Sequence, residues 1–280
     1  MAVVTVAKST PAYIREGAEI IKAIQSLSGS HSTWEVFQDF LAVSAISISN
    51  WVDWGPQKER EEEYLQTIKK YKPEEQKKLA SIFGTLTDEL QHISKTKGPY
   101  DVLGGVFHGL ELHNKYRGQF FTPFHICQMM GEMTVGDGTD AAIQEQGYVS
   151  LCEPCVGSGG MVLGFAKAME KRKLNYQQQL CVTACDIDIK CVHMAYLQLS
   201  LFGIPAIIIH GNSLTSEQWS IWHTPAYMFG LWPLKEMRNI NDVVAATQEK
   251  TVPDDNKIIS VPPENNFDYK VNKNGQISLF

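Results

Sequence analysis

Apolar residues recur at helical spacing through the first part of the chain. In residues 11–27 the isoleucines fall on one helical face, and Gly29 follows as a stop signal. Similar apolar stripes predict further helices that begin at the following positions: Thr33, Lys58, Pro73 and Tyr100. The pattern therefore predicts a helical N-terminal segment over residues 1–118.

The pattern then changes to short apolar runs that alternate with helical stretches. Runs typical of buried parallel strands occupy residues 149–153, 180–186 and 206–210. Helical patterns follow the first two runs, over residues 160–174 and 190–202. Strands that alternate with helices in this way predict an α/β fold built on a doubly wound sheet.

Two other stretches show neither helical spacing nor a strand-like apolar run. Residues 134–147 are rich in glycine and aspartate, which predicts a surface loop. After Leu234 the chain becomes polar, and we expect residues 241–275 to be largely disordered. We therefore predict that an α/β domain over residues 119–240 follows the helical segment and that a flexible tail over residues 241–280 completes the chain.

Composition narrows the functional classes. The chain has 280 residues, a hydrophobic fraction of 44% and a formal net charge of −6. An acidic protein does not attract DNA through its overall charge, so nucleic-acid contact needs a local patch or a partner. No apolar run reaches membrane-spanning length, and no charged and apolar leader opens the chain. We therefore expect a cytoplasmic protein without membrane contact.

The six cysteines fit reduced thiols of a cytosolic protein. Cys152 and Cys155 have metal-ligand spacing, and Cys181 and Cys185 offer two further thiols for a zinc site. Cys152 and Cys155 lie in a glycine-rich turn that is a candidate ligand-binding site, so we predict no metal.

That turn follows the run at 149–153 and precedes a helix. Gly157 and Gly159 permit backbone angles closed to other residues, and the helix directs its first N–H groups toward a ligand in the turn. The glycine spacing is neither the dinucleotide fingerprint nor a P-loop. Glu153 would repel a phosphate, so a ligand with an amine or a sulfonium suits the turn better. A plain glycine turn between a strand and a helix is the alternative.

The turn Glu153-Pro-x-x-Gly157-Ser158-Gly159-Gly160 resembles motif I of the S-adenosylmethionine (SAM) dependent DNA adenine-N6 methyltransferases. The similarity is greatest to the modification subunits of type I restriction systems. Upstream, Gly-Gln-Phe-Phe121-Thr122-Pro123 resembles motif X, which lies against the methionine end of SAM. Thr122 and Pro123 also fit the N-cap and first residue of a helix. The resemblance implies a Rossmann-like SAM-dependent methyltransferase fold.

Two further strings extend the resemblance. Asp186-Ile187-Asp188 is similar to motif II, where the first acid holds the ribose and the apolar residue packs on the adenine. A strand end with solvated acids is the alternative. Asn212 stands where the family has an aspartate that accepts a hydrogen bond from the adenine amino group. Its amide oxygen offers the same bond without charge assistance.

The resemblance fails at the catalytic motif, which is Asn/Asp-Pro-Pro-Tyr/Phe after a fourth apolar strand. At the expected place the chain has Thr224-Pro225-Ala226-Tyr227, and residues 218–223 are a poor apolar strand. By resemblance Tyr227 stacks on the flipped base and Thr224 accepts one hydrogen bond, while Pro225 keeps its place. The first motif residue, Asn or Asp, is replaced by Thr224, and the second proline is replaced by Ala226.

Two functions follow from this reading. The first is SAM-dependent methyl transfer to adenine N6 of duplex DNA, with a flipped adenine and a separate specificity subunit as partner. The second is a SAM-binding, catalytically impaired protein that regulates or assists at DNA. A structural protein with accidental motifs does not explain three motifs in the right order. A methylation assay separates the first two.

The chain ends in Gln276-Ile-Ser-Leu279-Phe280, which resembles the pentapeptide that docks bacterial proteins on the DNA sliding clamp. Leu279 and Phe280 would fill an apolar pocket and Gln276 would hydrogen-bond beside it. An apolar end that folds back on the domain is the alternative. Clamp docking would place the protein at the bacterial nucleoid.

Overall fold

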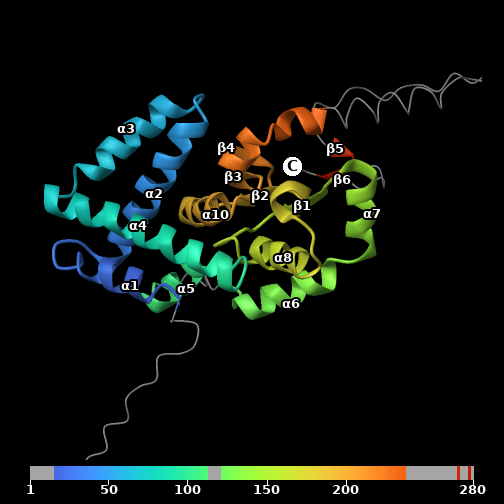
Figure 1. The fold of residues 1–280 in the computed structure, drawn as a ribbon. Helices are drawn as coiled ribbons and strands as arrows, with labels where there is room; N and C mark the ends of the chain where they lie inside the picture. The colour runs from blue at the N-terminus through green and yellow to red at the C-terminus, as the bar shows by residue number, and fades with distance from the viewer. Residues whose placement is uncertain (1–15, 113–120, 238–269, 272–276, 279–280) are drawn as a thin grey trace, which may run out of the picture.

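A four-stranded sheet lies at the centre of the C-terminal half of the protein (Figure 1). The computed structural model describes residues 16–112, 121–237, 270–271 and 277–278. The strand order is β1-β2-β3-β4, in which the first three are parallel and the last is antiparallel to β3. The bounds are β1 (Val149–Glu153), β2 (Leu180–Asp186), β3 (Ala206–Asn212) and β4 (Glu217–His223). The predicted α/β fold is confirmed.

Helices connect the parallel strands and cover the sheet. Helix α8 (Gly160–Lys171) and the short α9 (Tyr176–Gln179) join β1 to β2, and α10 (Ile189–Leu201) joins β2 to β3. Alternate residues of β2, namely Leu180, Val182 and Ala184, belong to the large hydrophobic core. Successive side chains of a strand point to opposite faces of the sheet. These three residues therefore lie on the same face, and this is the face that the core helices cover.

The predicted N-terminal helices are confirmed from residue 18 onward. They are α1 (Ala18–Gln25), α2 (Thr33–Val52), α3 (Gln57–Ile68), α4 (Pro73–Thr96) and α5 (Val102–Gly109). One hydrophobic core runs from Ile20 of α1 to Trp222 of β4, and α2 packs on α10 (Figure 1). The helical segment therefore shares its core with the sheet. The predicted boundary at residue 118 lies outside the described residues.

Arg60 of α3 anchors the helical segment to the edge strand β4. Its guanidinium is 5% exposed, donates a hydrogen bond of 2.6 Å to the carbonyl of Ile221, and lies 3.8 Å from the centre of the Trp222 ring. It also bonds the Ser49 hydroxyl and pairs with Asp53 at 3.6 Å. A buried charge needs such partners, so this contact fixes α2 and α3 against the sheet.

The predicted loop at 134–147 is wrong, because residues 137–146 form helix α7 (Asp137–Gln146). The glycines and aspartates that indicated a loop are its end signals. Gly147 closes the helix in the left-handed conformation with φ of 88°. Asp137 and Asp140 lie in the first turn, where carboxylates complement the helix dipole. Helix α6 (Phe124–Thr134) precedes it and packs on α8.

The expected absence of a fourth strand is also wrong. Residues 217–223 form β4, and Trp222, opposite Ile208, is buried in the core. An antiparallel edge strand needs apolar residues on one face only, so it lacks the continuous apolar run of a buried parallel strand. The sequence prediction applied the pattern of the wrong strand type.

The C-terminal part is described only in pieces. Helix α11 (Pro225–Phe229) follows β4, and β5 (Lys270–Val271) pairs antiparallel with β6 (Ile277–Ser278). The tail predicted to be flexible therefore contains a short two-stranded sheet. Gln276, Leu279 and Phe280 of the clamp-like peptide lie outside the described residues, and clamp docking stays a prediction.

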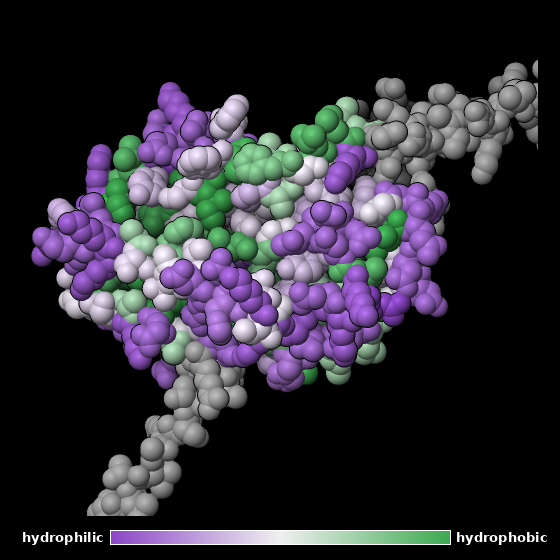
Figure 2. Space-filling view, viewed as in Figure 1, coloured by the Kyte–Doolittle hydropathy of each residue, from purple (hydrophilic) through white to green (hydrophobic). Residues whose placement is uncertain are grey.

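The surface in view is mostly hydrophilic (Figure 2). A hydrophobic patch lies beside the start of the grey C-terminal trace, where Leu231, Leu234 and Met237 are exposed. None of the described helices is long and apolar enough to cross a bilayer.

His193 of α10 gives the fold a dependence on pH. Burial, with the charges of His210 and Arg60, lowers the pKa of its imidazole to about 3. The unfolded chain binds this proton below about pH 6.5 whereas the folded protein does not. Stability should therefore fall by about 1.4 kcal/mol per pH unit as the pH drops below that value. Urea unfolding at neutral pH and at pH about 5 measures the loss, which His193→Leu should reduce. An equal loss of unfolding free energy in wild type and His193→Leu would contradict this prediction.

Candidate functional site

Three polar residues end the three parallel strands at one edge of the sheet. Glu153 ends β1, Asp186 ends β2 and Asn212 ends β3. In register, Glu153 lies opposite Ala184, and Asp186 lies opposite His210. Ligands of open α/β sheets bind at the carboxyl ends of the strands. The structure thus brings three of the residues predicted for the cofactor site to one edge of the sheet.

The glycine-rich turn after β1 is tied to the end of β2. The N–H of Gly157 donates to Asp186 Oδ2 at 2.8 Å, and the N–H of Val156 donates to the Cys185 carbonyl at 2.8 Å. Gly157 has φ of 55° and Gly159 has φ of 93°, which favour glycine at both positions. A side chain at either position would strain the turn that carries the site.

The motif X residues lie beside this turn. A Cβ on Gly157 would come within 3.1 Å of the Phe121 ring, so the two are in contact distance. Phe121 also packs on Phe107 of α5, with ring centres 4.8 Å apart. Thr122 and Pro123 are exposed at the start of α6. Pro123 rather than Thr122 is the N-cap of α6, one residue later than predicted.

Two carboxylates give the site its negative charge. Burial raises the pKa of Glu153, and the charge of Asp186 raises it further. Burial also raises the pKa of Asp186, although N–H donors from Asp188 and Gly157 oppose the shift. Within the described ranges neither Glu153 nor Asp186 forms an ion pair. The arrangement therefore suits a ligand that carries a positive charge.

The neighbouring charge at Asp188 is already balanced. Lys190 donates to both carboxylate oxygens of Asp188, at 2.7 and 2.6 Å, and lies 4.8 Å from the Trp34 ring. Asp188 also caps the N-terminus of α10 by accepting from the Lys190 N–H. Asp188 therefore has a structural role, which leaves Asp186 and Glu153 for a ligand.

Apolar and amide groups complete the edge. Ile187 is 62% exposed, which offers an apolar surface next to Asp186. Asn212 Oδ1 accepts the N–H of Leu214 at 3.0 Å and so shapes the turn after β3. The predicted adenine contact of Asn212 must share this oxygen.

Ser158, a predicted ligand contact, lies on the other side of the turn. Its side chain is buried, and its hydroxyl donates to Asp101 Oδ2 at 2.6 Å. The sequence prediction missed Asp101, although an aspartate three residues before Gly104 at the start of α5 is an N-cap signal. The hydroxyl of Ser158 thus supports the turn from behind and does not face the open edge.

The structure separates the predicted catalytic residues from this site. Strand β4 runs antiparallel, so Thr224, Pro225 and Tyr227 follow its end at the amino edge of β3, at the opposite side of the sheet. The fully buried Thr224 hydroxyl donates to the Ile204 carbonyl and accepts the N–H of Ala206. The Thr224 hydroxyl is therefore occupied by backbone hydrogen bonds. It also lies at the opposite edge of the sheet from Asp186, so it does not contact a substrate bound there. We therefore do not retain this assignment.

Tyr227 is likewise part of the core at the amino edge. It is 4% exposed, its hydroxyl donates to Glu236 at 2.7 Å, and it packs in a small cluster with Tyr148, Cys181 and Trp232. It is not placed to stack on a base. Because Cys181 belongs to this cluster, the four thiols of the zinc alternative do not converge.

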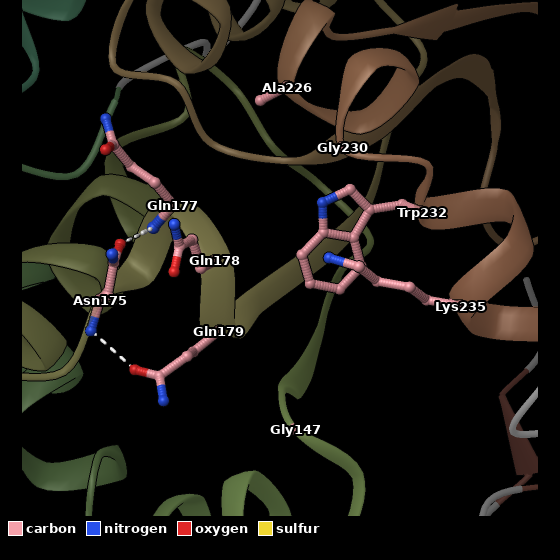
Figure 3. A pocket seen from close by; sticks show the side chains of 9 residues that line it. All are labelled: Gly147, Asn175, Gln177, Gln178, Gln179, Ala226, Gly230, Trp232 and Lys235. Atoms are coloured by element: carbon pink, nitrogen blue, oxygen red, sulfur yellow. Dashed lines mark hydrogen bonds between the residues drawn. The ribbon is translucent and has the colours of Figure 1, made fainter.

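A hollow of about 590 Å³ lies at this same amino edge (Figure 3). Side-chain amides of residues 175 and 177–179 line one wall, and Trp232 and Lys235 line the other. Asn175 Oδ1 accepts the N–H of Gln177 at 3.1 Å, and Gln179 Oε1 accepts the N–H of Asn175 at 2.8 Å. Asn175 thus caps the short helix α9, and the hollow lies apart from the carboxyl edge.

One family model and two solved structures are similar to this chain. Residues 100–270 match the model of the N-6 DNA methylase family. Two solved structures show limited likeness. One is assigned as a class I SAM-dependent methyltransferase of Listeria monocytogenes, with 14% identity, a TM-score of 0.43, and coverage of 72% of this chain and 54% of that one. The other is the methyltransferase subunit of a type I restriction-modification system of Streptococcus thermophilus, with 13% identity, a TM-score of 0.37, and coverage of 74% and 59%.

The chain thus spans little more than half of each of these two proteins. No curated protein matches it. The family match extends over more than half of the chain and includes the glycine-rich turn and the ends of β1, β2 and β3. The protein therefore belongs to the N-6 DNA methylase family, whose methyl donor is SAM.

Proposed function

We propose that the protein binds SAM at the carboxyl edge of β1, β2 and β3 and assists or regulates methyl transfer to adenine N6 in DNA. The observation that carries the proposal is the pair of partly buried carboxylates, Glu153 and Asp186, beside the turn at Gly157. Family membership supplies the cofactor and the type of reaction.

The residues present fit SAM. A cofactor with an ammonium and a sulfonium is attracted by two carboxylates that have no cation partner among the described residues. We propose that Asp186 accepts the ribose hydroxyls, that Ile187 packs on the adenine and that Glu153 lies toward the positive end. Phe121, Thr122 and Pro123 would close the methionine end, because Phe121 already lies against Gly157. When bound, SAM supplies the electrophilic methyl group.

Methyl transfer by the chain on its own should be slow or absent. The reaction on an adenine amino group needs hydrogen-bond acceptors for its protons, and the residues assigned to this role by sequence lie at the opposite edge. Losing one positioned acceptor in the transition state costs about a hundredfold in rate. This observation favours the second function, a SAM-binding protein that assists or regulates methylation at DNA.

DNA contact requires a partner in this proposal. The net charge of −6 gives no general attraction to phosphates, so a specificity subunit that reads the target sequence fits the chain. Recruitment to a sliding clamp through Gln276, Leu279 and Phe280 is a separate proposal. A pull-down with and without the last two residues tests it.

The deciding experiment measures transfer of labelled methyl groups from SAM to mixed duplex DNA by the isolated chain, with SAM binding measured on the same sample. We expect binding with little or no transfer. Tyr227→Phe is the control. Its hydroxyl donates to Glu236 at the far edge, so removing the hydroxyl should leave SAM affinity unchanged. Robust methylation of plain duplex DNA by the isolated chain, or loss of SAM binding in Tyr227→Phe, would contradict the proposal.

A further inference from the structure

A buried polar cluster lies directly behind the glycine-rich turn. It joins Asp101 at the N-cap of α5, Ser158 in the turn and Gln198 in α10. Asp101 is 6% exposed and Gln198 is completely buried. The three residues come from segments far apart in sequence, so the cluster links the N-terminal helices to the site.

Gln198 uses its whole hydrogen-bonding capacity in this cluster. Its Oε1 accepts the N–H groups of Val102 and Leu103, at 2.8 and 3.0 Å. Its Nε2 donates to Asp101 Oδ1 at 2.9 Å and to the carbonyl of Ser158 at 2.7 Å. A side-chain amide has two donors and two acceptor positions, and all four are filled. The orientation of Gln198 is therefore fixed.

Asp101 holds the same turn through its other oxygen. Oδ1 accepts the N–H of Gly104 at 2.8 Å in addition to Gln198, and Oδ2 accepts the Ser158 hydroxyl at 2.6 Å. Glycine is needed beside this carboxylate, because a Cβ on Gly104 would lie 2.2 Å from Asp101 Oδ2. Hydrogen bonds to a buried carboxylate are stronger than those between neutral groups.

The consequence is a turn whose middle residue is held at both its carbonyl and its side chain. Ser158 is bound from behind by Gln198 and Asp101, while Gly157 is bound from the side by Asp186. A ligand that meets a turn already in its bound conformation does not have to order it, which improves affinity. Neither Asp101 nor Gln198 faces the open edge, since both are buried.

We propose that Asp101 and Gln198 are positioning residues, which raise the affinity for SAM by holding the turn at Gly157 and Ser158 in its binding conformation. The inference rests on the proposed SAM site. It also gives the N-terminal helices a function, because α5 supplies the carboxylate that holds the turn.

Calorimetric titration of SAM into full-length variants tests the proposal. Asp101→Ala should bind about tenfold more weakly than wild type, since it leaves the Ser158 hydroxyl and one N–H of the Gln198 amide without an acceptor. Asp101→Asn is the conservative variant. Its amide keeps an acceptor for Gly104 and Gln198 and can donate to Ser158, so affinity should return to within about threefold of wild type.

Asp39→Asn is a matched control for stability. Asp39 is also 6% exposed and accepts a hydrogen bond from Tyr71, but it belongs to α2 and makes no contact with the turn. It should lower the unfolding temperature and leave SAM affinity unchanged. If Asp101→Ala fails to fold, Ser158→Ala removes only the hydroxyl and should still weaken binding.

The outcomes separate the two proposals. Absence of SAM binding by wild type would overturn the proposed function. Binding by wild type, with equal affinity in Asp101→Ala or Ser158→Ala measured below their unfolding temperatures, would overturn the positioning role. A tenfold loss in Asp101→Ala, recovery in Asp101→Asn and no change in Asp39→Asn would support it.

Discussion

Asp186→Ala should weaken SAM binding by about ten- to a hundredfold. The carboxylate ends β2 at the site edge and has no cation partner among the described residues. Losing one buried charge-assisted hydrogen bond costs about 1.5–3 kcal/mol, which corresponds to this range of affinity. The substitution also removes the acceptor of the Gly157 N–H, so the turn loses one of the hydrogen bonds that fix its conformation. Calorimetry of the folded variant measures the change.

Asp137→Ala is the matched control for that substitution. Asp137 is exposed in the first turn of α7, so the change in net charge is the same while the site edge is untouched. Its SAM affinity should equal that of wild type. Equal affinity in Asp186→Ala and Asp137→Ala would remove Asp186 from the site.

Gly164→Leu should be the most destabilising substitution considered for this fold, with a loss of about 3 kcal/mol or more. A Cβ on Gly164 would lie 2.4 Å from the carbonyl oxygen of Cys127, and a Cβ on Gly131 would lie 2.4 Å from the Gly164 oxygen. Helices α6 and α8 therefore touch backbone to backbone, and no rotamer change relieves the clash. Because α8 begins at the glycine-rich turn and α6 begins next to Pro123, separating them also moves both sides of the site.

Gly84→Ala is the control for Gly164→Leu. Gly84 lies within α4, and a Cβ there would meet no atom within 4 Å. Alanine favours helix over glycine by about 0.5–1 kcal/mol, so this variant should be slightly more stable than wild type. Urea unfolding compares the three proteins. A Gly164→Leu variant as stable as wild type would show that the two helices do not depend on close contact.

The parallel strands and their polar ends were predictable because both carry a local signal. The apolar runs in residues 180–185 and 206–209 indicate the buried strands β2 and β3, and the polar residue after each run marks its carboxyl end. Strand β1 lies at the sheet edge and is only partly buried, so its prediction depended on the glycine-rich turn that follows Glu153. The turn at Gly157 and Gly159 added a conformational signal that only glycine satisfies. Parallel pairing then places these ends together without further information.

Features that depend on tertiary context were not predictable. The direction of β4 decides whether Thr224 and Tyr227 lie at the carboxyl or the amino edge, and no local pattern states that direction. Likewise, Ser158 belongs to the turn by sequence, but the side on which its hydroxyl lies depends on Asp101, which precedes it by 57 positions. The glycines around α7 indicated a loop because a cap and a turn use the same residue types.

Hydrogen exchange of the full chain with and without SAM shows at which edge of the sheet the ligand binds. We expect slower amide exchange on SAM addition at residues 153–163 and 186–188, around the turn and the end of β2. Residues 224–235, at the amino edge beside the hollow, should exchange at unchanged rates. Protection confined to residues 224–235, or no protection at residues 153–163 in a protein that binds SAM, would contradict this placement of the ligand.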